Sequence, residues 1–267
     1  MTSYETLETT VNDGVGHLIL NRPERYNAMN GQMMNHDLPQ GWAELSADPN
    51  VRCIVFSGRG KNFCTGNDIK ETAELGGENI ARDAEWPAVA LTALQNNVRK
   101  PVITAIQGMC AGGGLYFAAH SDINISSSGA TYFDPHVDVG LAAAIEAVEL
   151  LTRVSLPVAL RMVCMGKDER MTAARALEVG LVDEVVPDGS ELDRAVALAQ
   201  VIASKSPSAV MRSKLALWEA ADRVRPEALR NSWAIVKRQW DDPDSIEGPA
   251  AFAEKRQPNW GPAPSSL

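Results

Sequence analysis

The sequence predicts an α/β fold. Short runs rich in β-branched residues alternate with segments of helical spacing along most of the chain, and the last part has helical patterns only. The chain has 267 residues, and 45% of them are hydrophobic. A chain of this length and composition can bury a large core and enclose a binding site.

Three predicted strands lie in the first half, at residues 14–23 (GVGHLILNRP), 51–60 (VRCIVFSGRG) and 100–108 (KPVITAIQG). Each is an apolar or alternating run that ends at a turn residue, which is typical of buried strands. The segments between them, residues 30–49 and 79–98, carry helical spacing, although Pro39 and Pro87 blur their boundaries.

The second half begins with the same alternation. Residues 121–134 (SDINISSSGATYFD) predict a strand pair, and residues 142–154 predict a helix. Residues 171–187 (MTAARALEVGLVDEVVP) predict a threonine-capped helix that ends at Gly180, followed by a last strand.

The alternation stops after this strand. Residues 191–206 and the chain beyond them follow a helical pattern that is interrupted only by prolines. We therefore expect a core domain of residues 1–189 and a helical C-terminal region of residues 190–267.

The charge balance limits the classes of partner. The chain has 25 Lys and Arg residues against 34 Asp and Glu residues, a net charge of -9, which argues against a broad nucleic-acid or anionic-membrane surface. A local basic pocket for a phosphorylated ligand remains compatible with this charge. The N-terminal stretch MTSYETLETTVNDG lacks the basic and apolar regions of a secretory signal, so we expect a cytoplasmic protein.

Four cysteines are scattered through apolar surroundings: Cys53, Cys64, Cys110 and Cys164. Their spacing matches neither a metal site nor a disulfide framework. We expect all four to be buried, reduced thiols.

A run of three glycines precedes an apolar, helix-like stretch in residues 110–122 (CAGGGLYFAAHSD). Glycines before a helix let another group approach the first amides of that helix, which have no intrahelical acceptor. Gly112, Gly113 and Gly114 could thus hold a phosphate, a carboxylate or a developing oxyanion, or they could serve close helix packing alone. No Gly-Lys-Ser/Thr follows and the spacing of a dinucleotide fingerprint is missing, which disfavours a P-loop and a hydride-transferring enzyme.

A second glycine turn, FCTGNDIKE, follows the strand predicted at residues 51–60. This turn could expose the backbone amide of Asn67. Two separated backbone donors, one from each turn, would form an oxyanion hole.

Five segments together identify a family resemblance: NRPERYNAMN, FSGRGKNFCTGNDIKE, KPVITAIQGMCAGGGLYFAAHSDI, ARALEVGLVDEVV and AFAEKRQPNW. In this order they resemble the crotonase, or enoyl-CoA hydratase/isomerase, superfamily over nearly the whole chain. The resemblance implies the crotonase (ClpP-like) α/β fold, a spiral of ββα units with a helical C-terminal region. It also implies a homotrimer or a dimer of trimers.

The resemblance further implies an enzyme with an acyl-CoA or enoyl-CoA substrate. Coenzyme A would enter as part of this substrate, with no tightly bound cofactor and no metal. The family holds the thioester oxygen between two backbone amides, which correspond here to Asn67 and Gly113. The residues that the resemblance places at coenzyme A are Arg25, Ala28, Thr65, Asp68, Ile69 and Lys255.

The chain departs from the family pattern at the acid/base positions. Hydratases of the family use two glutamates, and the corresponding residues here are Tyr116 and His136. A phenol with a pKa near 10 is a poor base at neutral pH, whereas an imidazole with a pKa of about 6.5 suits proton transfer. Tyr116 is then expected in the core or the acyl pocket, and His136 as the acid/base.

Other acidic residues could complete the site. Either Asp134 or Asp138 could orient the imidazole of His136. Glu146 lies on an apolar face near the position of a catalytic aspartate in other members, which is itself Ala144 here. Glu149 is expected to face solvent.

The residues leave several reactions open. Without paired glutamates, shifting the double bond of an enoyl-CoA by a single base is easier to support than hydration. Hydrolysis of a thioester or of a β-diketone carbon–carbon bond is an alternative, with His136 activating water. A noncatalytic acyl-CoA-binding subunit is a further alternative.

Overall fold

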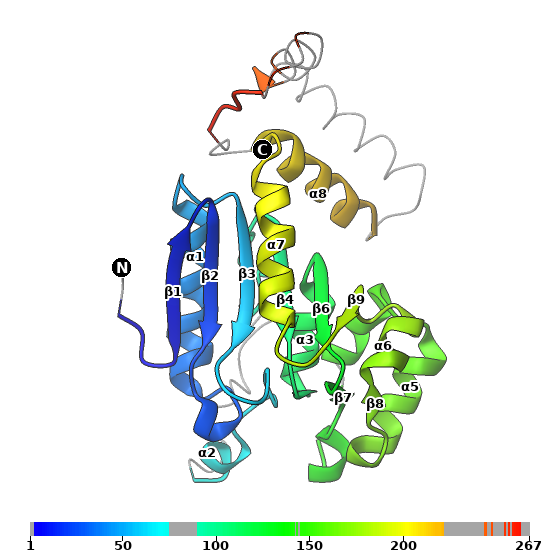
Figure 1. The fold of residues 1–267 in the computed structure, drawn as a ribbon. Helices are drawn as coiled ribbons and strands as arrows, with labels where there is room; N and C mark the ends of the chain where they lie inside the picture. Colours follow the sequence, from blue (N-terminus) through cyan, green and yellow to red (C-terminus); the bar gives the residue numbers. More distant parts are fainter. Residues whose placement is uncertain are drawn as a thin grey trace.

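The computed structural model describes residues 3–74, 90–141, 143 and 145–221, together with residues 243, 244, 247, 254, 256 and 258–262. Its main sheet has six strands in the order β1-β2-β3-β4-β6-β9 (Figure 1). Their bounds are β1 Leu7–Asn12, β2 Val15–Leu20, β3 Cys53–Gly58, β4 Val102–Ile106, β6 Ile123–Ser127 and β9 Glu184–Val186.

The main sheet starts with a hairpin and continues as a parallel sheet. β1 and β2 are antiparallel and joined by Asp13 and Gly14, both with positive φ, as a two-residue hairpin turn requires. The pairs from β2 to β9 are all parallel. Every residue of β4 is buried, because the central strands of a parallel sheet are covered on both faces.

A second, smaller sheet contains β5 (Met109–Ala111), β7 (Thr131–Phe133) and β8 (Met171–Thr172). β4 and β5 follow each other in the chain but belong to different sheets, and so do β6 and β7. The strand pair expected at residues 121–134 is therefore present as two strands, each in its own sheet. A helix follows each of these pairs, which is the ββα repeat that the resemblance implied.

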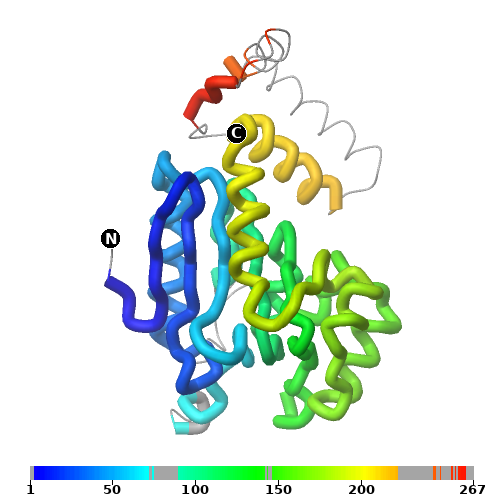
Figure 2. Tube along the Cα trace, in the orientation of Figure 1, coloured from blue at the N-terminus to red at the C-terminus, as the bar shows by residue number. Residues whose placement is uncertain are grey.

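Helices cover both faces of the main sheet. α1 (Leu38–Ala47) lies behind β1 and β2 in the view of Figure 1, and α7 (Glu191–Ala203) crosses in front. Ala195 and Ala199 of α7 pack in one buried cluster with Val15 and Val55 of the sheet. The first turns of the C-terminal helical region thus share a core with the strands, and the chain then continues into α8 (Pro207–Ala221), as Figure 2 traces.

The helix expected within residues 30–49 is present as α1, preceded by a π-helical turn at Met33–Asp37. Pro39 falls in the first turn of α1, where a missing amide hydrogen costs nothing. Of the helix expected at residues 79–98, residues 79–89, with Pro87, lie outside the described residues. Residues 91–98 form turns, so the expectation is wrong for this part.

Local side-chain hydrogen bonds explain this difference. The side-chain oxygen of Gln95 accepts hydrogen bonds from the backbone amides of Leu91 (3.0 Å) and Thr92 (3.1 Å). These bonds satisfy backbone groups that a helix would otherwise pair.

The second half follows the expected pattern with one addition. The helix expected at residues 142–154 is short, with α4 at Ile145–Glu149 and a 3₁₀ turn at Leu150–Thr152. An unexpected helix, α5, spans Leu156–Met165.

The threonine-capped helix is confirmed as α6 (Ala173–Val179). Thr172 accepts a hydrogen bond from the amide of Arg175 (3.3 Å), and Gly180 ends the helix with a φ of +85°. A short helix, α2 (Ile69–Glu74), follows the second glycine turn.

All four cysteines are free. Cys53, Cys64 and Cys110 are buried as expected, and burial raises the pKa of the Cys53 and Cys64 thiols to about 12. The expectation is wrong for Cys164, which is exposed on α5. No helix within the described ranges is long and apolar enough to cross a lipid bilayer.

Candidate active site

The glycine run forms the junction between β5 and α3 (Gly113–His120). Gly112 has a φ of +51°, a conformation that side chains disfavour. A Cβ on Gly113 would collide with Cε of Met29, and one on Gly114 with the carbonyl oxygen of Cys64. Close packing is therefore one reason for the glycines. The amide of Gly113, as the first residue of α3, has no intrahelical acceptor.

The second glycine turn packs directly against this helix start. Gly66 has a φ of +88°, and a Cβ there would lie 2.9 Å from the backbone nitrogen of Gly113. Met29 donates a hydrogen bond to the carbonyl of Gly66 (2.7 Å) and accepts one from the amide of Asp68 (2.8 Å). Because neighbouring backbone groups of an extended segment point in alternate directions, the amide of Asn67 is directed away from Met29. The two turns thus bring the backbone of Gly66, which precedes Asn67, against the backbone of Gly113.

The residues expected at coenzyme A fall into two groups. Ala28 and Asp68 are buried, and Asp68 is paired with Arg22, with 3.1 Å between Nη2 and Oδ2. Burial alone would raise the pKa of Asp68, but the amide of Glu71 and the guanidinium of Arg22 hold it below its usual value. Asp68 therefore holds the second glycine turn in place through its contacts with Arg22 and the amide of Glu71.

The other members of this set are more accessible. Arg25 ends a 3₁₀ turn (Pro23–Arg25) and is exposed, and so is Ile69 at the start of α2. Thr65 is half-buried near the carbonyl of Tyr26 (3.5 Å). Lys255 lies outside the described residues. The sequence did not identify Arg22 as the partner of Asp68, although Arg22 lies in the segment NRPERYNAMN, three residues before the predicted Arg25.

His136 lies beside the glycine junction. A Cβ on Gly112 would lie 3.6 Å from Cε1 of the imidazole. The reason is the small sheet: β5 pairs with β7, Ala111 is opposite Phe133, and the amide of Gly112 donates to the carbonyl of Phe133 (3.3 Å). Residues that follow β5 and residues that follow β7 are therefore neighbours.

Asp134, rather than Asp138, orients the imidazole. Nδ1 of His136 lies 2.6 Å from Oδ1 of Asp134, which also accepts the amide of His136 (3.0 Å). The carboxylate of Asp134 is fully buried. Asp138 instead accepts the amide of Lys167 (2.7 Å) and lies 3.5 Å from its Nζ.

Glu146 faces the other nitrogen of the imidazole, with 3.9 Å between Nε2 and Oε1. The pKa of His136 is raised, first by the hydrogen bond to Asp134 and further by the charges of Asp134 and Glu146, against the lowering effect of burial. The structure thus brings Glu146, a site candidate of the sequence analysis, to His136, while Ala144 lies outside the described residues.

Tyr116 is buried, and its hydroxyl accepts a hydrogen bond from Nε2 of Gln95 (2.7 Å). Burial and the charges of Glu149 and Glu146 raise the pKa of this phenol. Tyr116 is therefore no general base at neutral pH.

The expectation that Glu149 faces solvent holds only in part. Its Oε2 lies 3.0 Å from Nε2 of His120, and its side chain is partly buried. The helical period places Glu149 three residues after Glu146, on the face of α4 that contacts α3.

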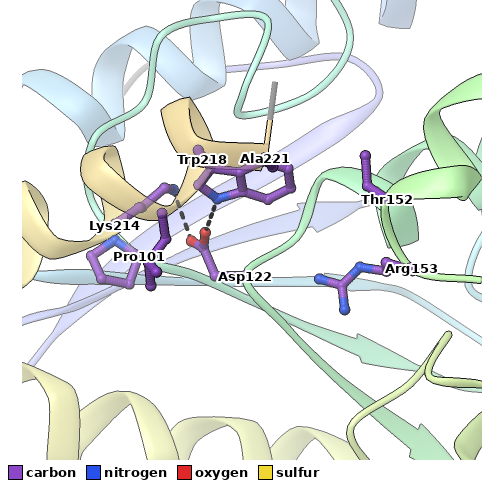
Figure 3. A pocket seen from close by; sticks show the side chains of 8 residues that line it. Pro101, Asp122, Thr152, Arg153, Lys214, Trp218 and Ala221 are labelled. Atoms are coloured by element: carbon purple, nitrogen blue, oxygen red, sulfur yellow. Dashed lines mark hydrogen bonds and ion pairs between the residues drawn. The ribbon is translucent and has the colours of Figure 1, made fainter. Parts of the chain in front are cut away.

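A cavity of about 370 Å³ lies elsewhere, at the C-terminal side of α3 (Figure 3). Asp122 receives a hydrogen bond from Nε1 of Trp218 (2.7 Å) and lies 2.8 Å from Nζ of Lys214, which ties α8 to the core. The residues that line this cavity are Pro101, Asp122, Thr152, Arg153, Lys214, Leu217, Trp218 and Ala221. None of the predicted site residues is among them.

Comparison with known proteins places this geometry in a family. The sequence profile of the enoyl-CoA hydratase/isomerase family matches residues 10–263. The chain is 33% identical to the (E)-benzylidenesuccinyl-CoA hydratase of Thauera aromatica, over 95% of this chain and 97% of that protein. It is 34% identical to the mitochondrial Delta(3,5)-Delta(2,4)-dienoyl-CoA isomerase of Homo sapiens, over 90% of this chain and 77% of that protein.

The fold agrees with these relatives. The crystal structure of an enoyl-CoA hydratase/isomerase from Mycobacterium paratuberculosis superimposes with a TM-score of 0.90 at 37% identity, covering 97% of this chain and 99% of that chain. The expected crotonase fold is thereby confirmed. The chain belongs to the enoyl-CoA hydratase/isomerase family and is an enzyme of that family.

Proposed function

We propose that this enzyme moves a proton at the carbon next to the thioester carbonyl of an acyl-CoA, with His136 as its acid/base. The observation that carries the proposal is the position of the imidazole. His136 lies beside Gly112, with Nδ1 held by Asp134 and Nε2 directed toward Glu146.

The bond to Asp134 favours the tautomer that carries its proton on Nδ1, which leaves the lone pair on Nε2 to accept a proton. Removal of a proton from the α-carbon places negative charge on the thioester oxygen. The amides of Asn67 and Gly113 would hold this oxygen, and two such donors lower the barrier by several kcal/mol, about 3 for each. The Gly66–Gly113 contact supports this arrangement.

The preferred reaction is a shift of the double bond of an enoyl-CoA. The imidazolium formed at His136 would return its proton to the γ-carbon, so one residue serves both steps. Two-glutamate hydration is disfavoured because Tyr116 stays protonated. Hydration with His136 as the only base would be compatible with the same site.

Hydrolysis is a second candidate, favoured by the Asp134–His136 pair, which also suits activation of a water molecule. Attack of this water on a thioester would release free coenzyme A, whereas attack on a β-diketone would break a carbon–carbon bond. Isomerisation releases neither product.

Deuterium exchange tests the proposal. The protein is incubated with an acyl-CoA in D₂O, and deuterium at the α-carbon is measured by mass spectrometry while a thiol reagent monitors free coenzyme A. We expect exchange in the native protein and in the control Asp138→Asn, and no exchange in His136→Ala, which should still bind the ester. Full exchange in His136→Ala would remove His136 from the mechanism.

We also propose that copies of the chain associate as a homotrimer or a dimer of trimers, with the helical C-terminal region contributing to the contact. Support comes from apolar side chains that the described helices of this region leave exposed, Val201 on α7 and Leu217 on α8. Light scattering of the full chain measures the mass of the assembly, and a monomer would contradict the proposal.

A further inference from the structure

The hydrogen bond between Gln95 and Tyr116 has a fixed direction. The side-chain oxygen of Gln95 faces the backbone amides of Leu91 and Thr92, so it must be the acceptor of this carboxamide. The NH₂ group of Gln95 then faces Tyr116 and donates to its oxygen over 2.7 Å. The hydroxyl proton of Tyr116 must therefore point to a different partner.

Within the described part of the chain, no residue accepts a hydrogen bond from this hydroxyl. Tyr116 follows Gly113 by three residues, which places both on one face of α3. The carboxylates of Glu146 and Glu149 act on the hydroxyl, and Glu146 lies opposite His136. The donor is thus next to the groups proposed for proton transfer.

A second set of contacts holds this donor in place. Oγ1 of Thr92 lies 2.8 Å from Nδ1 of His120, whose Nε2 lies 3.0 Å from Glu149. The ring of His120 also packs on the ring of Tyr116, with 4.6 Å between centroids. Gln95 is therefore anchored to α3 and α4 through its neighbour Thr92.

The direction of the Gln95–Tyr116 hydrogen bond limits the chemistry of the group that accepts the hydroxyl proton of Tyr116. It must be an acceptor, because the oxygen of Tyr116 already receives the bond from Gln95. A carboxylate would be repelled by Glu146 and Glu149 on α4, which packs against α3, since Glu149 contacts the His120 ring that lies on Tyr116. Neutral oxygen acceptors meet both conditions, and among them a carbonyl oxygen brings no donor proton of its own.

We propose that Tyr116, oriented by Gln95, donates a hydrogen bond to a second, neutral carbonyl in the acyl group, so that the enzyme prefers oxoacyl-CoA esters. Tyr116 is the contact residue and Gln95 is a positioning residue. This inference rests on the proposed function, because the acyl group must first be held at Gly113.

Binding affinity tests the inference separately from catalysis. Calorimetry compares hexanoyl-CoA with its 3-oxo, 4-oxo and 5-oxo derivatives, which place the ketone at different distances from the thioester. We expect at least one ketone to bind about tenfold more tightly than hexanoyl-CoA, the size of one net hydrogen bond. Tyr116→Phe should abolish this gain and leave the affinity for hexanoyl-CoA unchanged.

Gln95→Glu tests the positioning role of Gln95 directly, because a glutamate side chain has the same shape as a glutamine side chain. One carboxylate oxygen can still accept the amides of Leu91 and Thr92, while the other would accept the proton of Tyr116 and turn it away from the ligand. We expect the ketone preference to disappear although the tyrosine remains. A thermal unfolding midpoint equal to that of the native protein shows that each variant is folded.

The outcomes separate the two proposals. Equal binding of all four esters, or a ketone preference that survives in Tyr116→Phe or in Gln95→Glu, would overturn this inference alone. Failure to bind any of the esters would overturn the proposed function as well.

Discussion

Nδ1 of His136 lies 2.6 Å from Oδ1 of Asp134, a carboxylate that the fold removes from solvent. Sequence spacing left two acids as candidates for this role, because Asp134 and Asp138 both lie two residues from the imidazole. The tertiary structure separates them: Asp138 turns to the amide of Lys167, and Asp134 stays with His136.

Asp134→Asn should move the pH dependence of turnover. His136 acts as a base in its neutral form, which appears only as the pH rises through its raised pKa. Without the carboxylate this pKa should fall toward about 6.5, so the rising limb of the pH–rate profile should shift to lower pH. At the plateau, turnover should fall about a hundredfold or more because the tautomer is no longer fixed.

The raised pKa of His136 also predicts how the free energy of unfolding changes with pH. A histidine whose pKa is higher in the folded state stabilises the fold fully below about pH 6.5 and loses this contribution as pH rises through the folded pKa. Urea unfolding of the native protein and of Asp134→Asn should therefore differ in pH dependence over this interval. Parallel curves would contradict the assignment of Asp134.

Glu146→Gln should reduce turnover about ten- to a hundredfold and lower the pKa of His136, since the glutamate charge contributes to its elevation. Glu178→Gln is a matched control on the surface, where Glu178 pairs with Arg175 at 2.8 Å. Steady-state kinetics over a pH series measures both effects. Native turnover and an unshifted profile in Glu146→Gln would exclude this residue from the site.

Gly66→Ala should abolish activity because a methyl group would press on the backbone nitrogen of Gly113. Gly189→Ala is the control: its φ of +84° matches the +88° of Gly66, but a Cβ there meets no atom within 4 Å. Both variants should lose about 1 kcal/mol of stability from backbone strain, with a larger loss for Gly66→Ala. If both retained native activity, the Gly66–Gly113 contact would not form part of the site.

The buried Lys100 should increase the free energy of unfolding at alkaline pH. Its Nζ is buried and donates to the carbonyls of Leu45 (2.9 Å) and Asp48 (2.6 Å) at the end of α1, and burial lowers its pKa to about 8, against the opposing charge of Asp48. The unfolded chain binds this proton more tightly, so the free energy of unfolding should rise between about pH 8 and 10.4.

Lys100→Met removes that titration and leaves the two carbonyls without their donor, which should cost about 1–3 kcal/mol near pH 7. Urea unfolding of both proteins at pH 7.5 and 9.5 measures the difference. An equal change with pH in the two proteins would contradict the role given to Lys100.

Much of the fold could be predicted because its signals are local. Apolar runs specify the strands, Thr172 and Gly180 mark the ends of α6, and the glycines of residues 112–114 mark the start of α3. The turn at residues 91–98 could not be predicted, since the capping bonds of Gln95 compete with a helix that the spacing favours. The distribution of β6 and β7 between two sheets also depends on tertiary pairing.

The acid/base candidates could be predicted from the family resemblance. His136 corresponds to a catalytic position of the family and Glu146 lies near one, and the structure brings the two side chains together. Arg22 and Gln95 act through partners far along the chain, Asp68 and Tyr116, so no sequence spacing indicates them. The contact of the partly buried Glu149 likewise depends on His120, which lies on another helix.

The pairing of β5 with β7 has a consequence for how such an enzyme can change. The glycine turn proposed to hold the thioester follows one strand of this ladder, and the residues proposed for acid/base chemistry follow the other. Substitutions in residues 134–141 can therefore replace the chemistry while the neighbouring strand keeps its hold on the substrate. Substrate recognition and proton transfer would then be separable in this fold, because each depends on the residues after a different strand.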